Sequence, residues 1–419
     1  MTRALTVWWN DAPVGVLRLD ENGDLAFQYE AAWLADDRRP PISLSLPKQD
    51  GPFGRAQTRP FFAGLLPEEG PRQAVARILG VSRENDFGLL EGLGGDVAGA
   101  LTLWPEGEPP PSEEVGASLV ALSEAELERI LLELPRRPLM AGEGGVRLSL
   151  AGAQTKLPVV QVDGGFAVPL RGQPTTHILK PAPKEYPTFP DNEAFCMRLA
   201  STLGLPVAEA RPLLAGDQRC LLVRRYDRIE TADGRLRRLH QEDFCQALGV
   251  TPEHKYASER GPDFRSSFDL LRRTVRPPAP AVLTLLDAAL FNLIIGNADA
   301  HGKNFSLLHT DEGLRLAPLY DLLCTAFYPE VHANMAMRMG GRSRLEEFTR
   351  QTLTDFAAQV GVGAPWVRRR AGALADQARA AAPGVAETLG SEGSDPAVLK
   401  ALIDLVNRRA DVVRSLVAA

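Results

Sequence analysis

The stretch NADAHGKNFSLL, residues 297–308, places amide and charged side chains between two apolar segments. The preceding residues 285–296 predict a buried helix, and FSLL begins a predicted hairpin that would bring Asp321 back beside Asn304. A carboxylate that accepts a hydroxyl proton, an amide oxygen and a second carboxylate that holds magnesium are the groups that phosphoryl transfer requires. Asp299, Asn304 and Asp321 therefore predict a catalytic loop for phosphoryl transfer.

The spacing of this loop matches one found in protein kinases, but a second interpretation fits it equally well. Asp299 and Asn304 are separated like the Asp and Asn of the kinase loop H-R-D-x-x-x-x-N, although Ala298 stands in place of the arginine. Asp and Asn are also common in capped turns, and such a turn would explain the stretch by itself. Features elsewhere in the chain are needed to distinguish a catalytic loop from a capped turn.

The composition is that of an ordinary globular protein. The 419 residues are 44% hydrophobic and 24% charged, with a formal net charge of -6, so the chain as a whole is unsuited to binding a polyanion. The N-terminus lacks the features of a signal peptide, and we expect no segment that spans a membrane. The four cysteines lack metal-binding spacing and indicate reduced thiols, so the expected location is cytoplasmic.

The chain changes character along its length. Short strand-like runs dominate the first part, a mixed β region with one helix follows, and the remainder is mostly helical. The predicted parts are a β-rich N-terminal subdomain (1–105), a linker and helix (106–145), a kinase N-lobe core with a phosphate loop (146–235) and a helical C-lobe with the catalytic loop (236–419).

Three local features within these parts predict a linker, a strand and a helix cap. The Pro- and Glu-rich stretch 104–118 predicts a linker. Residues 146–150, VRLSL, predict a strand. Asp191 or Asn192 is expected to cap the helix that follows the mixed strands.

A loop of small residues lies in SLAGAQTKLPV, residues 149–159. Gly152 and its small neighbours would let backbone N–H groups approach a phosphate, and Thr155 and Lys156 add polar side chains. The stretch does not match the Walker A pattern G-x-x-x-x-G-K-[ST]. A plain β-hairpin is the alternative.

Lys180 ends the apolar strand that follows this loop. Kinases place their phosphate-binding lysine in this position, and Glu193 on the next helix is placed to pair with it. A solvated lysine and a glutamate favoured by the helix dipole are the alternatives. VRRYDR (223–228) fits either an adenine-facing hinge or a set of solvated arginines, and HQED (240–243) either approaches the substrate or caps a helix.

The order of these features favours a kinase more than any one of them does. A small-residue loop, a strand with a lysine, a helix with a glutamate, a joining strand, a helical lobe and then the Asp–Asn loop follow one another as they do in kinases.

The chain also resembles the HipA family of serine/threonine kinase toxins, which act with HipB-type antitoxins. The stretches that carry the resemblance lie within residues 40–325: SLSLP, FFAGLLPEEGPR, VRLSLAGAQTKLPV, PTTHILKP, QEDFCQALG, HKYASERGPDF, GNADAHGKNFSLL and LAPLYDLL. The resemblance implies an α+β, two-lobed, protein-kinase-like fold related to the lipid kinases, with a β-rich N-terminal subdomain and a helical C-terminal lobe.

The resemblance further implies roles for individual residues. Asp299 would be the catalytic base, and Asn304 and Asp321 would hold Mg²⁺. Ser149 would be autophosphorylated, which shuts the enzyme off. His301 and Lys303 are further candidates in the catalytic loop, with no role assigned. The residues that would bind ATP are Ala151, Gly152, Ala153, Gln154, Thr155, Lys156, Lys180, Arg224, Arg225 and Tyr226.

Cofactors and partners follow from the same resemblance. ATP and Mg²⁺ are the implied cofactors, a HipB-type helix-turn-helix antitoxin is the implied partner, and DNA would be contacted mainly through that antitoxin. The acceptor would be a translation-related protein such as glutamyl-tRNA synthetase, and no membrane contact is expected. Two other functions fit the motifs: a kinase that acts on a small molecule or lipid, and a non-enzymatic corepressor that binds an antitoxin.

Overall fold

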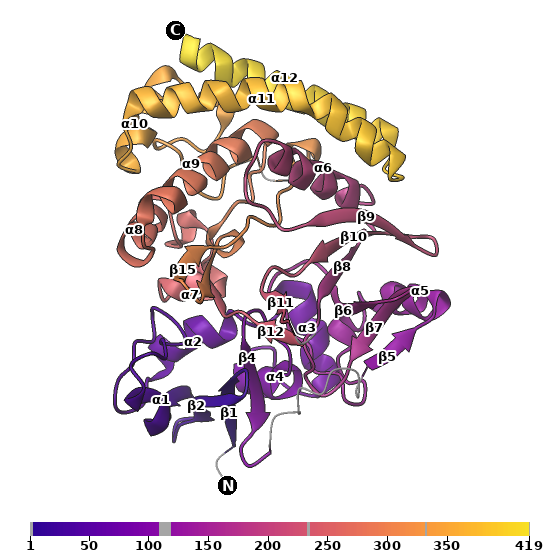
Figure 1. Cartoon of the computed structure of the whole chain (residues 1–419), viewed down its shortest axis with the longest axis vertical. Coiled ribbons are helices and arrows are strands. Elements are labelled where there is room, and N and C mark those ends of the chain that lie inside the picture. The colour runs from indigo at the N-terminus through magenta and orange to yellow at the C-terminus, as the bar shows by residue number, and fades with distance from the viewer. Residues whose placement is uncertain (1–2, 109–118, 233–234, 332, 419) are drawn as a thin grey trace.

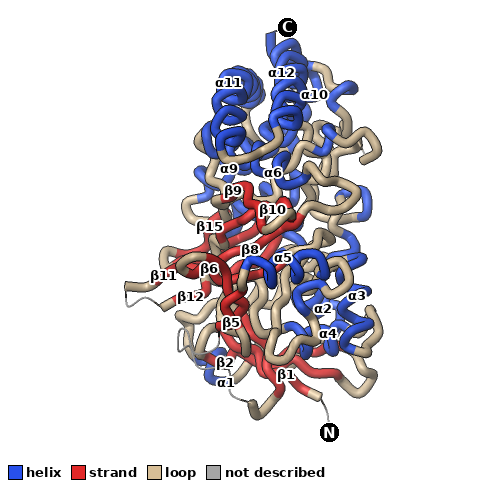
Figure 2. The backbone as a smooth tube through the Cα atoms, turned by 90° about the vertical axis from the view of Figure 1, so that its right-hand side faces the viewer, coloured by secondary structure: helices blue, strands red, loops and turns tan. Residues whose placement is uncertain are grey.

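Three parts of the molecule are stacked along its longest axis (Figure 1). The computed structural model describes residues 3–108, 119–232, 235–331 and 333–418. The N-terminal subdomain lies at one end, a six-stranded sheet in the middle and a helical lobe at the other end. The side view shows the same order, with the sheet between the C-terminal helices and the N-terminal strands (Figure 2). The expected α+β architecture is therefore confirmed.

The N-terminal subdomain is a four-stranded antiparallel sheet, in the order β3–β2–β1–β4, covered by helices. Its elements are β1 (Ala4–Trp9), β2 (Ala12–Leu19), β3 (Leu25–Tyr29), α1 (Ala31–Ala35), α2 (Arg55–Ala63), α3 (Glu69–Leu79), α4 (Asp86–Leu93) and β4 (Leu101–Pro105). Phe27, Phe53 and Phe62 are fully buried together and give the subdomain a core of its own. It is more helical than its β-rich start suggested.

The middle sheet forms the N-lobe, with the strand order β5–β7–β6–β8–β10–β9. Its elements are β5 (Leu119–Leu122), α5 (Glu124–Glu133), the 3-10 helix η1 (Pro138–Met140), β6 (Leu157–Val162), β7 (Gly165–Pro169), β8 (His177–Pro181), α6 (Phe189–Thr202), β9 (Ala210–Ala215) and β10 (Gln218–Arg224). The part predicted as linker and helix thus adds an edge strand and a helix to this sheet. The linker predicted over 104–118 begins inside β4, and its residues 109–118 lie outside the described residues.

The strand predicted for residues 146–150 was wrong. This segment runs along the N-terminal subdomain, where Leu148 forms one isolated parallel bridge with Asp96. The N–H of Ser149 also donates to the carbonyl of Asp96 at 2.9 Å. Val146, Leu148 and Leu150, whose alternation predicted a strand, are buried although the segment forms no strand.

The predicted cap of α6 was also wrong. The helix begins at Phe189, and Thr188 occupies the N-cap position. Asp191 lies inside the helix and pairs with Arg219 at 2.8 Å. The side chain of Asn192 forms hydrogen bonds with the backbone carbonyl and N–H of Cys324 in the C-lobe. Tertiary contacts, which a local capping rule cannot include, determine the roles of both residues.

The C-lobe is helical and carries a small sheet of the order β13–β14–β15. The hairpin β11 (Arg228–Glu230) and β12 (Leu236–Arg238) precedes it. The remaining strands and α-helices are β13 (Gln241–Asp243), α7 (Phe244–Ala247), α8 (Phe264–Thr274), α9 (Pro278–Ile295), β14 (Ser306–Thr310), β15 (Gly313–Leu316), α10 (Arg350–Gln359), α11 (Ala364–Ser391) and α12 (Pro396–Ala418). The 3-10 helices are η2 (Pro252–His254), η3 (Ala257–Glu259), η4 (Gly302–Asn304), η5 (Thr325–Phe327) and η6 (Leu345–Glu347). The predicted hairpin after the catalytic loop is confirmed as β14–β15.

No membrane span was expected from the sequence, but among the described residues helix α9 has the length and apolarity of one. Its 18 residues have a mean hydropathy of 1.7, so the helix meets both criteria. However, 67% of it is buried inside the protein, and Leu285, Phe291 and Ile294 have no exposed surface. A helix that is apolar on all sides suits the centre of a lobe, and α9 occupies that place.

Buried charges hold the N-terminal subdomain against the lobes. Asp96 has no exposed surface and pairs with Arg225, Arg228 and Arg238 at 3.1, 2.8 and 3.2 Å. Burial acts to raise the pKa of Asp96, but the guanidinium groups outweigh it and hold the pKa well below its usual range. The alternative of solvated arginines in VRRYDR is therefore wrong for Arg225 and Arg228.

Candidate active site

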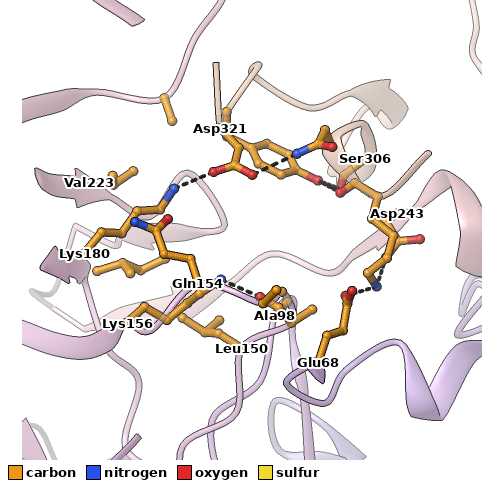
Figure 3. A pocket seen from close by; sticks show the side chains of 18 of the residues that line it. Glu68, Ala98, Leu150, Gln154, Lys156, Lys180, Val223, Asp243, Ser306 and Asp321 are labelled. Carbon is orange, nitrogen blue, oxygen red and sulfur yellow. Dashed lines mark hydrogen bonds and ion pairs between the residues drawn. The ribbon is translucent and has the colours of Figure 1, made fainter. Parts of the chain in front are cut away.

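A cavity of about 450 Å³ lies where the N-terminal subdomain and the two lobes meet. Figure 3 shows its two ends: Lys180 and Asp321 point toward each other at one end, and Glu68 and Asp243 at the other. Apart from Ser149 and Thr155, every site residue predicted from the sequence lines this cavity. The fold thus brings together groups that are widely separated along the chain.

The catalytic loop is held by hydrogen bonds of its own polar side chains. The Asn297 oxygen accepts the N–H of Asp299 at 3.0 Å, and its amide nitrogen donates to Asn292 at 3.0 Å. The Asn304 oxygen accepts the N–H of His301 at 3.1 Å. The two interpretations of this stretch are therefore compatible, because a self-capped turn is what presents Asp299 to the cavity.

Asp299 lines the cavity and is exposed to solvent there. The hydroxyl of Tyr256 donates to its Oδ1 at 2.9 Å. Partial desolvation and, to a smaller extent, the charge of Asp321 raise the pKa of Asp299 to about 6, although the hydrogen bond from Tyr256 acts to lower it. A carboxylate with a pKa near neutrality is suited to accept a proton from a hydroxyl group.

Lys180 connects the N-lobe to the C-lobe at one end of the cavity. Its Nζ lies 2.7 Å from Oε1 of Glu193 and 2.7 Å from Oδ1 of Asp321. The amide nitrogen of Asn304 donates to Oδ2 of Asp321 at 2.9 Å. Burial opposes ionisation of Asp321, but Lys180 outweighs it and keeps the pKa of this carboxyl well below its usual range. The pairing of Lys180 with Glu193 and the return of Asp321 to Asn304 are as predicted.

The donors at this end fit a magnesium ion. Mg²⁺ is usually held by one or two carboxylates together with substrate phosphates, and Asp321 supplies an ionised carboxylate beside the Asn304 amide. Asn304 turns its nitrogen toward Asp321, so coordination through its oxygen requires the amide to rotate by half a turn. Asp321 has a φ of 59°, a strained conformation that aspartate tolerates better than most residues and that is common at functional sites.

The small-residue loop is folded around Lys156. Gly152 has a φ of 109°, and its carbonyl accepts the N–H of Glu68 at 3.1 Å. The Nζ of Lys156 donates to the carbonyl of Ala151 at 2.5 Å. Burial and the charge of Lys180 lower the pKa of Lys156 to about 8, which leaves the amine mostly protonated at neutral pH. An anion at this end would raise that pKa and strengthen the charge state.

The three residues of the predicted hinge have different surroundings. Arg224 is exposed and lies 3.5 Å from Glu209. The guanidinium of Arg225 is committed to the buried cluster around Asp96. Tyr226 lines the cavity with its ring beside that of Tyr320, at a centroid distance of 5.8 Å. Tyr226 and the backbone of this segment are thus the parts that a flat ring would meet.

Ser149 is inaccessible in this conformation. It has no exposed surface, and its Oγ donates to the carbonyl of Leu65 at 2.7 Å. The hydroxyl partner is thus in the N-terminal subdomain, 84 residues away, and not in the segment around Ser149.

The two unassigned residues of the catalytic loop are both buried. Burial lowers the pKa of His301 to about 3, so its ring is neutral, and its Nδ1 has no hydrogen-bond partner within the described residues. Lys303 donates to Asp243 at 2.8 Å and to the carbonyl of Gly64 at 3.3 Å. Lys303 is therefore tied to the surrounding structure.

Sequence reasoning missed several residues of the site. Glu68 enters the cavity from the start of α3, and its Oε2 lies 2.8 Å from Nζ of Lys255. Lys255 and Tyr256 were likewise missed, and the hydroxyl of Tyr256 donates to Asp299. Both alternatives given for HQED hold for Asp243, which lines the cavity, caps α7 and pairs with Lys303. All four residues lie in stretches that carry the family resemblance, but nothing in their spacing predicts that they meet.

Two family models match most of the chain, and known proteins match between four fifths and almost all of it. The model described as the HipA-like C-terminal domain matches residues 148–384, and that described as the HipA N-terminal domain matches residues 5–104. A putative kinase of Sinorhizobium fredii, Y4mE, is 52% identical over 98% of this chain and 99% of its own length. The serine/threonine-protein kinase toxin HipA of Shewanella oneidensis is 33% identical over 80% of this chain and 78% of its own length.

A solved structure has the same fold. The chain superposes on one from the complex of Shewanella oneidensis HipA, HipB and operator DNA with a TM-score of 0.85 and 29% identity. The match covers 98% of this chain and 99% of that one. The agreement includes the N-terminal subdomain and both lobes, which confirms the expected fold.

Proposed function

The chain belongs to the HipA family of kinases, and on that premise we propose that it is an ATP- and Mg²⁺-dependent serine/threonine protein kinase that acts as a toxin. The observation that carries the proposal is the contact of Lys180 with both Glu193 and Asp321, at 2.7 Å each, in a cavity that also holds Asp299. These are the cation, the metal-binding carboxylate and the base that phosphoryl transfer needs.

In the proposed reaction, Asp299 acts as the base. The Oγ–H of an acceptor serine passes its proton to a carboxylate oxygen of Asp299 while Oγ forms a bond to the γ-phosphorus of ATP. The bond from the γ-phosphorus to its bridging oxygen breaks, and the electron pair leaves with ADP. A pKa of about 6 leaves Asp299 ionised at neutral pH and able to take the proton.

The remaining residues would bind the nucleotide. Lys180 and Lys156 would contact the phosphates beside the small-residue loop, and the segment Arg224–Tyr226 would face the adenine. Mg²⁺, when bound to Asn304 and Asp321, would neutralise charge on the β- and γ-phosphate oxygens.

Autophosphorylation of Ser149 is part of the proposal and has a structural consequence. A phosphate carries close to two negative charges at neutral pH, and Ser149 is fully buried against Leu65. An unpaired charge of that kind is not tolerated in a closed interior. Phosphorylation would therefore require the segment around Ser149 to leave its place and would keep it out, which would dismantle the phosphate loop.

The relatives suggest the partners. The Shewanella protein is named a serine/threonine-protein kinase toxin, and its structure contains HipB and operator DNA. We extend this to a HipB-type antitoxin for the present chain, with DNA contacted mainly through that antitoxin. The acceptor would be a protein of the translation apparatus.

The proposal is tested by comparing the wild type with Asp299→Asn in an assay with γ-labelled ATP and Mg²⁺. Loss of the base should lower phosphate incorporation into Ser149 and into acceptor proteins by about 10²–10⁴-fold, with an unchanged melting temperature. Asp311→Asn, which alters an exposed aspartate away from the cavity, is the matched control.

Two outcomes would contradict parts of the proposal. Continued labelling of Ser149 in the Asp299→Asn variant would show that Asp299 is not the base. A wild type that phosphorylates lipids or small molecules, but no protein, would overturn the protein-kinase assignment.

A further inference from the structure

A second lysine–glutamate pair faces the cavity opposite Lys180. Nζ of Lys255 lies 2.8 Å from Oε2 of Glu68, and both residues are at least 91% buried. The Lys180–Glu193 pair at the other end has the corresponding distance of 2.7 Å. Both lysines line the same space (Figure 3 labels Lys180 and Glu68).

The second pair lies beside the base. Tyr256, the residue after Lys255, donates to Asp299 at 2.9 Å. Burial acts to lower the pKa of Lys255. The charge of Glu68 and, to a smaller extent, that of Asp299 outweigh burial and raise this pKa, so the side chain is cationic. A charged amine thus lines the same cavity as the group that would receive the acceptor's proton, and the residue after it contacts that group.

The other candidates for a cation at this place are unsuitable. Lys303 is engaged by Asp243 at 2.8 Å and by the carbonyl of Gly64 at 3.3 Å. His301 is buried within the turn that holds Asn304. Lys255 makes one hydrogen bond, to Glu68, within the described residues, which leaves further N–H groups of its three for a ligand.

Two buried polar atoms in the same region have no hydrogen-bond partner. Within the part of the chain that the structure describes, these are Oε1 of Glu68, which lies 3.6 Å from Nζ of Lys303, and Nδ1 of His301. Buried polar atoms are rarely left unpaired, and those that are occur where a ligand or a functional strain accounts for them.

We propose that Lys255 contacts the phosphoryl group during its transfer and that Glu68 of the N-terminal subdomain positions it. This rests on the proposed kinase function. Negative charge on the equatorial oxygens of the transferred group is stabilised by fixed cations, and a cation beside the base lies where that group must pass. Glu68 holds Lys255 in position as Glu193 holds Lys180. The second carboxylate oxygen of Glu68 lies 3.6 Å from Nζ of Lys303. The N-terminal subdomain is then a part of the active site.

The first test uses ADP with Mg²⁺ and aluminium fluoride, which together mimic the planar phosphoryl group and need no acceptor protein. In Lys255→Met, the affinity for ADP alone should change by less than about threefold. The extra affinity that aluminium fluoride confers should fall by about 10²-fold, because the lost contact acts on the transferred group. Lys255→Arg should recover a part of that affinity.

The second test separates kcat from KM. Lys255→Met should lower kcat for autophosphorylation by about 10²–10³-fold with little change in the KM for ATP, as expected for a contact made in the transition state. Glu68→Gln should lower kcat by about tenfold, since the lysine remains but is held less firmly. Lys400→Met, on the exposed face of α12, is the matched control.

The outcomes distinguish this inference from the proposed function. A wild type that neither binds ADP nor turns over ATP would refute the kinase function itself. A wild type that does both, together with a Lys255→Met variant that keeps its kcat and its aluminium fluoride response, would overturn the role of Lys255. If Lys255→Met fails to fold because buried Glu68 loses the closer of its two cations, the double variant Lys255→Met/Glu68→Met removes both charges and takes its place in the same comparison.

Discussion

The two lysine–glutamate pairs of the cavity have similar geometry but different origins. Lys180 and Glu193 are 13 residues apart and belong to adjoining elements of one lobe, β8 and α6. Lys255 and Glu68 are 187 residues apart and belong to the C-lobe and the N-terminal subdomain. The first pair can form when the N-lobe folds. The second forms only when the subdomain is docked, so subdomain docking and the end of the cavity near Asp299 are coupled.

The pairs also differ in how their charges are shared. Among the described residues, Lys180 is the cation within 4 Å of Glu193 and Asp321, so one cation balances two carboxylates. At the other end, Glu68 lies within 4 Å of both Lys255 and Lys303. Loss of a lysine should therefore be more damaging at the Lys180 end than at the other.

The largest effect is expected from Lys180→Met. The change leaves Glu193 buried without a cation, and removal of one partner of a buried pair costs about 3–5 kcal/mol in the free energy of unfolding. ADP binding should also be lost, because Lys180 is proposed to contact the phosphates. Urea denaturation and an ADP titration measure the two effects.

A compensated variant separates stability from nucleotide binding at this end. Lys180→Met/Glu193→Met removes both buried charges and should regain most of the stability, while ADP binding stays lost. If the double variant also recovers ADP binding, Lys180 has only a structural task.

A smaller loss is expected from Lys303→Met at the opposite end. Glu68 keeps Lys255, and Asp243 keeps the N–H of Gln246 at 2.8 Å, so the cost should be about 2 kcal/mol. The affinity for ADP should be nearly unchanged, because Lys303 is committed to the protein. Parallel urea and ADP measurements on both single variants test the comparison, and equal losses of stability would contradict it.

A change in pH dependence is expected from Tyr256→Phe. The Tyr256 hydroxyl stabilises the ionised form of Asp299, so its removal should raise the pKa of this carboxyl above about 6. Activity is lost as the pH falls through that pKa, since a protonated Asp299 cannot accept a proton. The acid limb of kcat/KM should therefore move to higher pH by about one unit. Tyr186→Phe is the control, and an unmoved limb would show that Asp299 does not govern it.

The smallest effect is expected from Ser149→Ala. The serine hydroxyl joins the segment before the phosphate loop to Leu65 of the N-terminal subdomain, and loss of one buried hydrogen bond costs about 1 kcal/mol. Thermal unfolding beside Ser415→Ala, at an exposed site on α12, measures this. A loss several times larger would mean that this bond, and not the Lys255–Glu68 pair, dominates docking at the cavity.

Much of the active site was predictable because its parts are close in sequence. The hairpin β14–β15 returns Asp321 to Asn304 over a short loop, and the strand-to-helix step from β8 to α6 brings Lys180 to Glu193. In both cases, regular secondary structure and a short connection restrict where the second residue can lie. The motif order predicted the lobes for the same reason.

The errors have a common physical cause. The strand predicted at residues 146–150 and the helix cap predicted at Asp191 or Asn192 rested on local patterns. In the structure, a neighbouring part of the molecule supplies the partners: the N-terminal subdomain for Ser149, and Arg219 for Asp191. An apolar pattern indicates burial but does not identify the surface that provides it.

The sequence by itself determined the fold class, the order of the lobes and the loop that presents Asp299, since turn chemistry, periodicity and short connections act over few residues. Only the tertiary structure decided that Lys303 is committed to the protein and that Glu68 enters the active site. The partners concerned are 239 residues apart for Lys303 and Gly64, and 187 for Lys255 and Glu68. Contacts over such separations depend on how complete subdomains pack, and no local pattern encodes that packing.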